Sequence, residues 1–365
     1  MYKKLPLYLL ALCSSLANIS CSSGSSSSSS SSSPYMTLNY SDAATNSSTL
    51  ITGIRGVAQS SDVYISGIYE STNSTSAQEG LLYVGSISGV GTWHLLQYPS
   101  SSGITVSSTA FYGPNNGNES DTIQLVGNYT TIETESSALG LLYQGPVDGS
   151  GTWATLTPPV ESGDTLLNTI AHSTMGGIIV GNYDTALHSG KAFIYDITNE
   201  SYYDIEKPGA VSITAYGIWY NGGNSYTITG GYSDLDQLGV DEGYIADWNS
   251  DTHEISNWRS YNYKDEPITS TISHFEGITS DGNGGYNLVS DWTDVDESSN
   301  NGAAFVNVTR DNSGQFGNAL WIDYRYPGSE ITSANTVYQT YVLGVYTESG
   351  SDVTNSYVVN ILDLY

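Results

Sequence analysis

Hydrophobic positions along the chain recur in short clusters separated by turn residues, and one cluster occurs six times. Each copy has five positions: a hydrophobic residue, a second residue that is usually hydrophobic, a small residue, any residue and an aromatic residue. The copies are ISGIY at 65–69, LVGNY at 125–129, IVGNY at 179–183, ITGGY at 228–232, LVSDW at 288–292 and VLGVY at 342–346. Their small residues are 60, 54, 49, 60 and 54 positions apart. A period of about 50 residues with strand-like content predicts a propeller or another repeat array.

Each repeat divides into four runs, here named A to D, that are bounded by turn residues and read as strands. In the first repeat the runs are 50–58, 63–69, 81–85 and 93–98. Run D begins with an aromatic residue and has tyrosine or a turn residue five positions later. The sixth repeat has runs A to C at 331–338, 340–346 and 357–364, and no run D.

The missing run is present at the other end of the chain. Residues 35–41 read YMTLNYS, which places Tyr35 and Tyr40 at the spacing of Trp93 and Tyr98. We therefore predict an all-β fold, a six-bladed β-propeller of four-stranded blades over residues 35–365, whose last blade is closed by the N-terminal strand. An open β-solenoid or two β-sandwiches are the alternatives, and neither explains why the last repeat lacks the strand that the start supplies.

The turns between runs C and D read SISGVGTW at 86–93 and PVDGSGTW at 146–153. They resemble the Asp-box hairpin of sialidase-like propellers, SxDxGxTW, although Ser88 and Ser150 depart from that pattern. The repeat also resembles kelch-type propellers, in which a glycine ends one strand and a tryptophan opens another. Both resemblances imply a fold and no activity.

The charge and the N-terminus restrict where the protein acts. The net charge is −28 with only nine Lys and Arg, which excludes nucleic acid as a partner because phosphate binding needs clustered cations. Lys3 and Lys4 precede an apolar stretch at 5–16 that is too short to span a bilayer, so residues 1–20 are predicted to be a signal peptide. Either the chain is cleaved after Ala17 and secreted, or Cys21 is lipidated and residues 21–34, rich in serine, form a tether at the outer membrane or cell surface.

Candidate binding residues lie on the A runs, which line the central channel of a propeller. We select Arg55, His172, Tyr216, His274 and Glu276 as ligand-binding residues at the channel mouth. Among the acidic residues only Glu276 lies on an A run, whereas glycosidases need two carboxylates that flank the scissile bond. A histidine hydrogen-bonded at the channel wall is the alternative to a catalytic one, and no catalytic residue is assigned.

The loops between runs B and C carry fourteen carboxylates and no Lys or Arg, which predicts one strongly negative face. The densest loop reads DLDQLGVDE at 234–242, so Asp234, Asp236, Asp241 and Glu242 are candidate ligands for Ca²⁺, a cation that takes several oxygen ligands from a short loop. Solvated loops without a metal are the alternative.

The aromatic residues that end the B runs point to the same face, where they either stack on sugars or pack one blade against the next. Together these features predict a non-enzymatic binding scaffold, exported or held at the membrane only by its lipid anchor, whose partner is a carbohydrate or an extracellular protein. A carbohydrate-active enzyme, hydrolase or lyase, that uses loop carboxylates is one alternative, and a structural surface protein is another.

The anchor prediction is tested by replacing Cys21. If Cys21 carries lipid, the wild-type protein partitions into the detergent phase and the Cys21→Ser variant is released to the aqueous phase. Cys13→Ser is the matched control, because Cys13 lies inside the predicted signal peptide. Equal detergent partitioning of the wild type and Cys21→Ser would contradict lipid attachment at this position.

Overall fold

The computed structural model describes residues 33–40, 47–71, 78–101, 103–134, 137–234, 242–267, 270–297 and 300–364. Residues from Pro34 onward form one compact unit. The predicted signal peptide, Cys21, and two of the candidate calcium ligands, Asp236 and Asp241, lie outside the described residues.

The strands form six antiparallel sheets, each of which is one blade. Blade 1 is β2 (Ser47–Gly56), β3 (Val63–Ser71), β4 (Glu79–Gly85) and β5 (Gly91–Leu96). Blade 2 is β6 (Val106–Asn116), β7 (Ile123–Thr131), β8 (Leu139–Gly145) and β9 (Thr152–Leu156), with the 3₁₀ turn η1 (Ile132–Thr134) after β7. Blade 3 is β10 (Leu166–Met175), β11 (Ile178–Thr185), β12 (Lys191–Asp196) and β13 (Ser201–Ile205).

The other three blades follow the same order with two variations. Blade 4 has an interrupted inner strand, so it is β14 (Ala210–Ile213), β15 (Gly217–Gly222), β16 (Ser225–Asp234), β17 (Glu242–Asn249) and β18 (Ile255–Tyr261), followed by η2 (Tyr263–Asp265). Blade 5 is β19 (Thr271–Ser280), β20 (Tyr286–Asp294), β21 (Asn301–Arg310) and β22 (Phe316–Tyr324). Blade 6 is β23 (Ser329–Tyr338), β24 (Tyr341–Glu348), β25 (Thr354–Asn360) and β1 (Tyr35–Thr37), with η3 (Ile361–Leu364) after β25.

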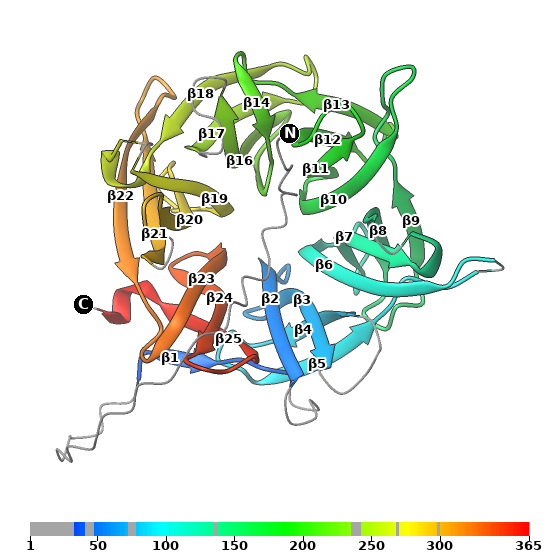
Figure 1. The fold of residues 1–365 in the computed structure, drawn as a ribbon, viewed down its shortest axis with the longest axis horizontal. Coiled ribbons are helices and arrows are strands. Elements are labelled where there is room, and N and C mark those ends of the chain that lie inside the picture. The colour runs from blue at the N-terminus through cyan, green and yellow to red at the C-terminus, as the bar shows by residue number, and fades with distance from the viewer. Residues whose placement is uncertain are drawn as a thin grey trace. The chain divides into compact units, whose positions relative to one another are not determined.

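The six sheets form a ring with the first strand of each blade at the centre (Figure 1). β1 pairs with β25 as the outermost strand of blade 6, in the register Tyr35↔Val359 to Thr37↔Tyr357. This confirms the predicted six-bladed propeller closed by its N-terminal strand. The core lies between neighbouring sheets: Leu82 and Leu96 of blade 1, for example, pack with Phe111 and Leu125 of blade 2.

A β-bulge occurs at one equivalent position of the inner strand in five blades. In blade 2, Phe111 pairs with Gly127 and Gly113 pairs with Val126, so Tyr112 is left out of the ladder. In blade 4 the interruption between β14 and β15 has the same effect, and Tyr216 lies within it. A bulge turns the extra residue away from the ladder. The residues placed in this way, one per blade, are Thr52, Tyr112, His172, Tyr216, Glu276 and Asn335.

The bulge explains the small residue in the repeated cluster. The residue before each bulge lies opposite that small residue, as in Ile51↔Gly67, Phe111↔Gly127 and Ala334↔Gly344. A Cβ on Gly127 would overlap the backbone carbonyl oxygen of Ala110, which the bulge brings against β7. Blade 5 differs, because Ser290 occupies the position opposite Phe275.

Neighbouring blades are joined by the residue five positions after the first aromatic of run D. Tyr98 lies beyond the end of β5 and stacks on Tyr129 of blade 2, with ring centroids 3.8 Å apart and planes 7° apart. The sequence prediction that run D extends to residue 98 is therefore wrong, since the chain has already turned to the next blade. The equivalent contacts are Tyr40 on Tyr69, Lys207 over Tyr232, Tyr263 on Trp292 and Tyr326 on Tyr346. The aromatic residues that end the B runs thus pack blade against blade.

The hairpins between the third and fourth strands are closed by a side-chain oxygen. In the second hairpin Asp148 accepts hydrogen bonds from the backbone N–H and the hydroxyl of Ser150, while the Trp153 indole donates to the Gly149 carbonyl oxygen. Three more hairpins are closed by Asp196, Asn249 and Asp311 in the same way. The hairpin that resembles an Asp box is therefore a local folding element here.

The bulge and glycine contact predicts a specific destabilisation. Gly127→Ala should lower the free energy of unfolding by about 1–3 kcal/mol, because the new methyl group overpacks the backbone of β6. Ser290→Ala is the matched control and should cost less than Gly127→Ala, only the hydrogen bond from Ser290 Oγ to the Asp291 carbonyl oxygen, since blade 5 already accommodates a Cβ at this position. Chemical denaturation measures both changes, and equal effects of the two substitutions would contradict the explanation.

Candidate functional site

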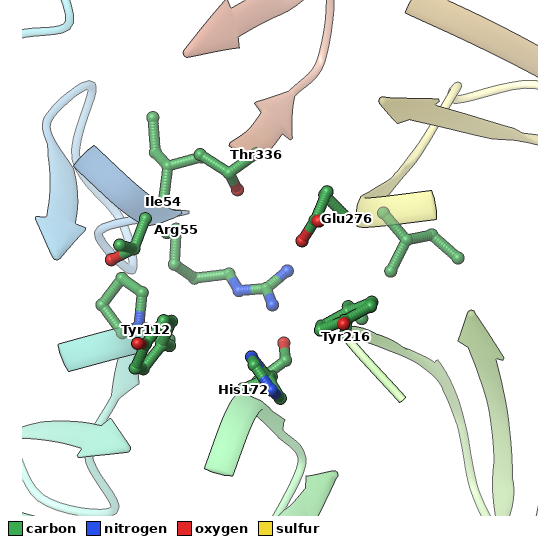
Figure 2. A pocket seen from close by; sticks show the side chains of 15 residues that line it. Ile54, Arg55, Tyr112, His172, Tyr216, Glu276 and Thr336 are labelled. Atoms are coloured by element: carbon green, nitrogen blue, oxygen red, sulfur yellow. The ribbon is translucent and has the colours of Figure 1, made fainter. Parts of the chain in front are cut away.

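The bulge residues surround a cavity on the axis of the ring. The cavity is lined by five of them, Thr52, Tyr112, His172, Tyr216 and Glu276, together with Arg55 and adjoining residues. Figure 2 shows Arg55, Tyr112, His172, Tyr216 and Glu276 converging from five blades on one space. The cavity volume is about 20 Å³, which is room for about one water-sized group. We refer to Thr52, Tyr112, His172, Tyr216, Glu276 and Asn335 as the channel ring.

One side of the channel ring is an arc of aromatic and imidazole rings. Tyr112 and His172 meet edge to face with centroids 5.1 Å apart, and His172 and Tyr216 do so at 4.6 Å. Tyr216 continues to His274 at 5.5 Å. His274 Nε2 lies 2.6 Å from Glu276 Oε1, so the arc ends in an imidazole–carboxylate pair. Contacts of this kind hold each ring in one orientation.

The rest of the ring is polar and small. Thr52 donates from Oγ1 to the carbonyl oxygen of Phe111 at 2.6 Å. Asn335 donates from Nδ2 to the carbonyl oxygen of Ile51 at 2.6 Å. Both bonds cross from one blade to the next, so these side chains help to close the ring while they face the channel.

Arg55 lies three residues beyond Thr52 on β2 and extends from blade 1 towards blade 4. Its guanidinium carbon is 5.5 Å from the ring centroid of Trp219. Figure 2 shows the guanidinium in the middle of the view, between side chains of the other blades. The residue is 9% exposed, and its Nε has no hydrogen-bond partner among the described residues.

Burial controls protonation in the channel. It lowers the pKa of Arg55 to about 10, so the guanidinium stays charged at neutral pH. Burial also lowers the pKa of His172 to about 4 against the opposing charge of Glu276, so this imidazole is neutral. Its Nε2 lies 2.6 Å from Asn182 Oδ1. Burial, reinforced by Glu276, raises the pKa of Tyr112 to about 12, which keeps the phenol protonated.

The structure brings the five selected ligand-binding residues together in one place. Arg55, His172, Tyr216 and Glu276 line the cavity, and His274 lies behind Glu276 as its hydrogen-bond partner. Sequence reasoning missed Thr52, Tyr112 and Asn335. A second repeated pattern marks them: a hydrophobic or small apolar residue, the ring residue, then glycine, serine or threonine, as in ITG at 51–53, FYG at 111–113 and ANT at 334–336.

The acidic loops are partly occupied with their own folding. Asp184 accepts a hydrogen bond from the backbone N–H of Gly190, and Asp294 accepts from those of Asp296 and Glu297. These bonds lower the pKa of Asp294. Within the described ranges no three His, Cys, Asp or Glu residues are grouped as metal ligands. Calcium binding at Asp234 and Glu242 stays a prediction, because Asp236 and Asp241 between them are not described.

Comparisons with known proteins reveal the fold alone. No family model matches the chain, and no curated protein matches its sequence. A protein of unknown function from Dyadobacter fermentans has a similar structure, with a TM-score of 0.56, 10% identity, and coverage of 89% of this chain and 97% of that one. The GH93 α-L-arabinofuranosidase of Fusarium graminearum, in complex with arabinobiose, has a TM-score of 0.53 and 11% identity, and the match covers 91% of this chain and 99% of that one. Trypanosoma rangeli sialidase, in complex with sialic acid, has a TM-score of 0.52 and 12% identity, and the match covers 90% of this chain and 58% of that one.

These neighbours support the six-bladed propeller and its resemblance to sialidase-type propellers. At such low identity they assign no residue a role in this chain. In the described part of the chain no helix has the length and apolarity needed to cross a bilayer.

A second half-buried carboxyl group lies between blades 5 and 6. Asp291 on β20 accepts hydrogen bonds from Ser333 Oγ at 2.5 Å and from the backbone N–H of Ala334 at 2.7 Å, both on β23. These bonds favour the charged form. Burial and the nearby charge of Glu276 oppose them and raise the pKa of Asp291 to about 7.

The raised pKa of Asp291 predicts a pH dependence of stability. The folded state binds this proton more tightly than the unfolded state, so the contribution of Asp291 to stability falls as pH rises from about 4 to about 7. In the Asp291→Asn variant the melting temperature should depend less on pH between about 4 and about 7, and at pH 8 it should be higher than that of the wild type. Glu330→Gln, an exposed control on β23, should leave the profile unchanged. An unchanged slope in Asp291→Asn would contradict the assignment.

Proposed function

We propose that the protein is a carbohydrate-binding propeller that holds the end of a saccharide at the channel ring. The observation that carries this proposal is the arc of Tyr112, His172 and Tyr216, which meets hydrogen-bonding groups at both ends. Sugar rings offer apolar C–H faces and many hydroxyl groups. Aromatic side chains beside fixed polar groups match both features.

The size of the cavity limits how a saccharide is held. A space of about 20 Å³ takes one water-sized group and no sugar ring. The sugar ring would therefore lie above the channel ring, on the side where the inner strands begin, and insert one substituent. The bonds Thr52 to Phe111 and Asn335 to Ile51 fix the opposite wall, so the ring is preorganised for binding.

Catalysis is the second candidate function, and the pair His274–Glu276 is the observation that favours it. A carboxylate held by an imidazole at the channel wall suits a general acid or base. Asp291 is the nearby second carboxyl group, but its oxygens accept hydrogen bonds from β23. This arrangement favours binding over hydrolysis, for which two carboxylates must flank the scissile bond. Structural neighbours with TM-scores above 0.5 include enzymes named as an arabinofuranosidase and a sialidase, and their names support catalysis as the second candidate function.

We also propose that the protein is exported and acts at the cell surface or outside the cell. The basic residues Lys3 and Lys4, the apolar stretch that follows and the serine-rich residues after Cys21 support this location. Extracellular saccharides are then accessible partners.

The binding proposal is tested with a panel of polysaccharides and their oligosaccharides, measuring both retention of the protein and release of reducing ends. Tyr216→Ala should weaken binding about tenfold, equivalent to about 1.4 kcal/mol. Tyr203→Ala is the matched control, because Tyr203 lies on the outermost strand of blade 3 and stacks on His253. Equal retention of wild type and Tyr216→Ala would exclude the channel ring as the binding site.

Glu276→Gln separates the two candidate functions. If the protein only binds, no reducing ends appear with either form. If it is a hydrolase, wild type releases reducing ends and Glu276→Gln loses this activity while it remains bound to the polysaccharide. Release of reducing ends by wild type would replace the binding proposal with the enzyme candidate.

A further inference from the structure

We propose that Arg55 forms an anion subsite inside the channel, which takes a single small monovalent anion or the carboxylate of a larger acidic ligand. The subsite lies in the same cavity that the channel ring lines, so an anion there would occupy the space proposed above for one substituent of a saccharide. It lies on β2 beyond Thr52, and it requires no sugar to be occupied.

Arg55 is the exception among the arginines. Arg310 forms an ion pair with Asp247, Arg259 donates to the Phe316 carbonyl oxygen and to Asn318, and Arg325 donates to the Glu330 carbonyl oxygen. Arg55 forms no ion pair or hydrogen bond with any described residue, and its Nε is buried without a partner.

This lack of a partner is notable in a chain with 37 Asp and Glu residues against nine Lys and Arg. A buried charge is costly unless it is paired, and removing it from water without compensation destabilises the fold. An anion bound at the guanidinium supplies the missing charge and accepts its hydrogen bonds.

One carboxylate lines the cavity together with Arg55. Glu276 lines the same cavity, but its Oε1 is paired with His274 and it forms no ion pair with Arg55. Trp219 lies with its ring beside the guanidinium, Tyr338 is a further neighbour that favours the charged form of Arg55, and Tyr112 and His172 line the cavity. Their pKa values keep both uncharged at neutral pH.

The cavity selects the ligand by size. A volume of about 20 Å³ accepts one water-sized group, so a halide or one carboxylate end fits and a bulky sulfonate does not. Two sources of the anion are consistent with this chemistry, a free ion such as formate or bromide and the carboxylate of an acidic sugar such as galacturonate.

The subsite is tested by thermal unfolding in sodium formate and in sodium bromide, with ionic strength held constant by sodium methanesulfonate. Formate should raise the melting temperature of the wild type by about 2 °C or more. Arg55→Met should lose this shift, and it should fold, because blade 3 carries Met175 at the equivalent position. Arg325→Met is the matched control, with an arginine at the end of blade 5, and should keep the shift. Arg55→Lys retains the charge and should keep part of it.

Galacturonate forms a separate arm and distinguishes the source of the anion. A shift with galacturonate but not with formate or bromide, lost in Arg55→Met, assigns the subsite to an acidic sugar. Bromide in crystals should give an anomalous peak beside the Arg55 guanidinium. Equal shifts in wild type and Arg55→Met, or no shift with any of the three anions, would overturn the subsite. Loss of saccharide binding in Tyr216→Ala bears on the proposed function and leaves this result unaffected.

Discussion

The contact between the bulged inner strand and the small residue of the neighbouring strand is the constraint on which the rest of the structure depends. At this point the backbone carbonyl of one strand lies where a Cβ of the other would be, as between Ala110 and Gly127. The contact allows the extra residue to leave the ladder, and the ladder resumes after it. Because it occurs near the axis of the ring in five of the six blades, with Ser290 in place of glycine in blade 5, one local feature of two paired strands is repeated around the channel.

The ring has two unlike halves. Blades 2 to 5 contribute Tyr112, His172, Tyr216 and the Glu276–His274 pair, whose rings are in mutual contact. Blades 6 and 1 contribute Asn335 and Thr52, which bond to the backbone of the next blade. A symmetric scaffold therefore presents an asymmetric site, which is suited to a ligand with one apolar face and one polar edge. The stacking of Tyr98 on Tyr129 and its equivalents fixes the angle between blades, and so fixes the geometry of the site.

The sequence was sufficient for the architecture because the repeated cluster and the displaced strand at 35–37 depend on local periodicity. The same reasoning selected Arg55, His172, Tyr216, His274 and Glu276 from their place on the inner runs. It missed Thr52, Tyr112 and Asn335, because the short pattern around each of them is recognised as a bulge only once the register between two strands is known. The same reasoning placed Trp93–Tyr98 in one strand. Tyr98 in fact packs on the next blade, and its residue type does not distinguish it from an aromatic residue inside the sheet. Bond partners such as those of Asp291 depend on the distance between blades and leave no trace in the sequence.

Five of the six ring residues are left out of the strand pairing by a bulge, and this has a consequence for how such proteins diverge. A substitution at one of these positions changes what the channel presents to a ligand and leaves the strand pairing on either side in place. The flanking small residues, in contrast, are fixed by backbone contacts and tolerate little change. Ligand specificity can therefore change one blade at a time through single side chains at Tyr112, His172 and Tyr216, whereas Thr52 and Asn335 also bond to the next blade and are less free to change.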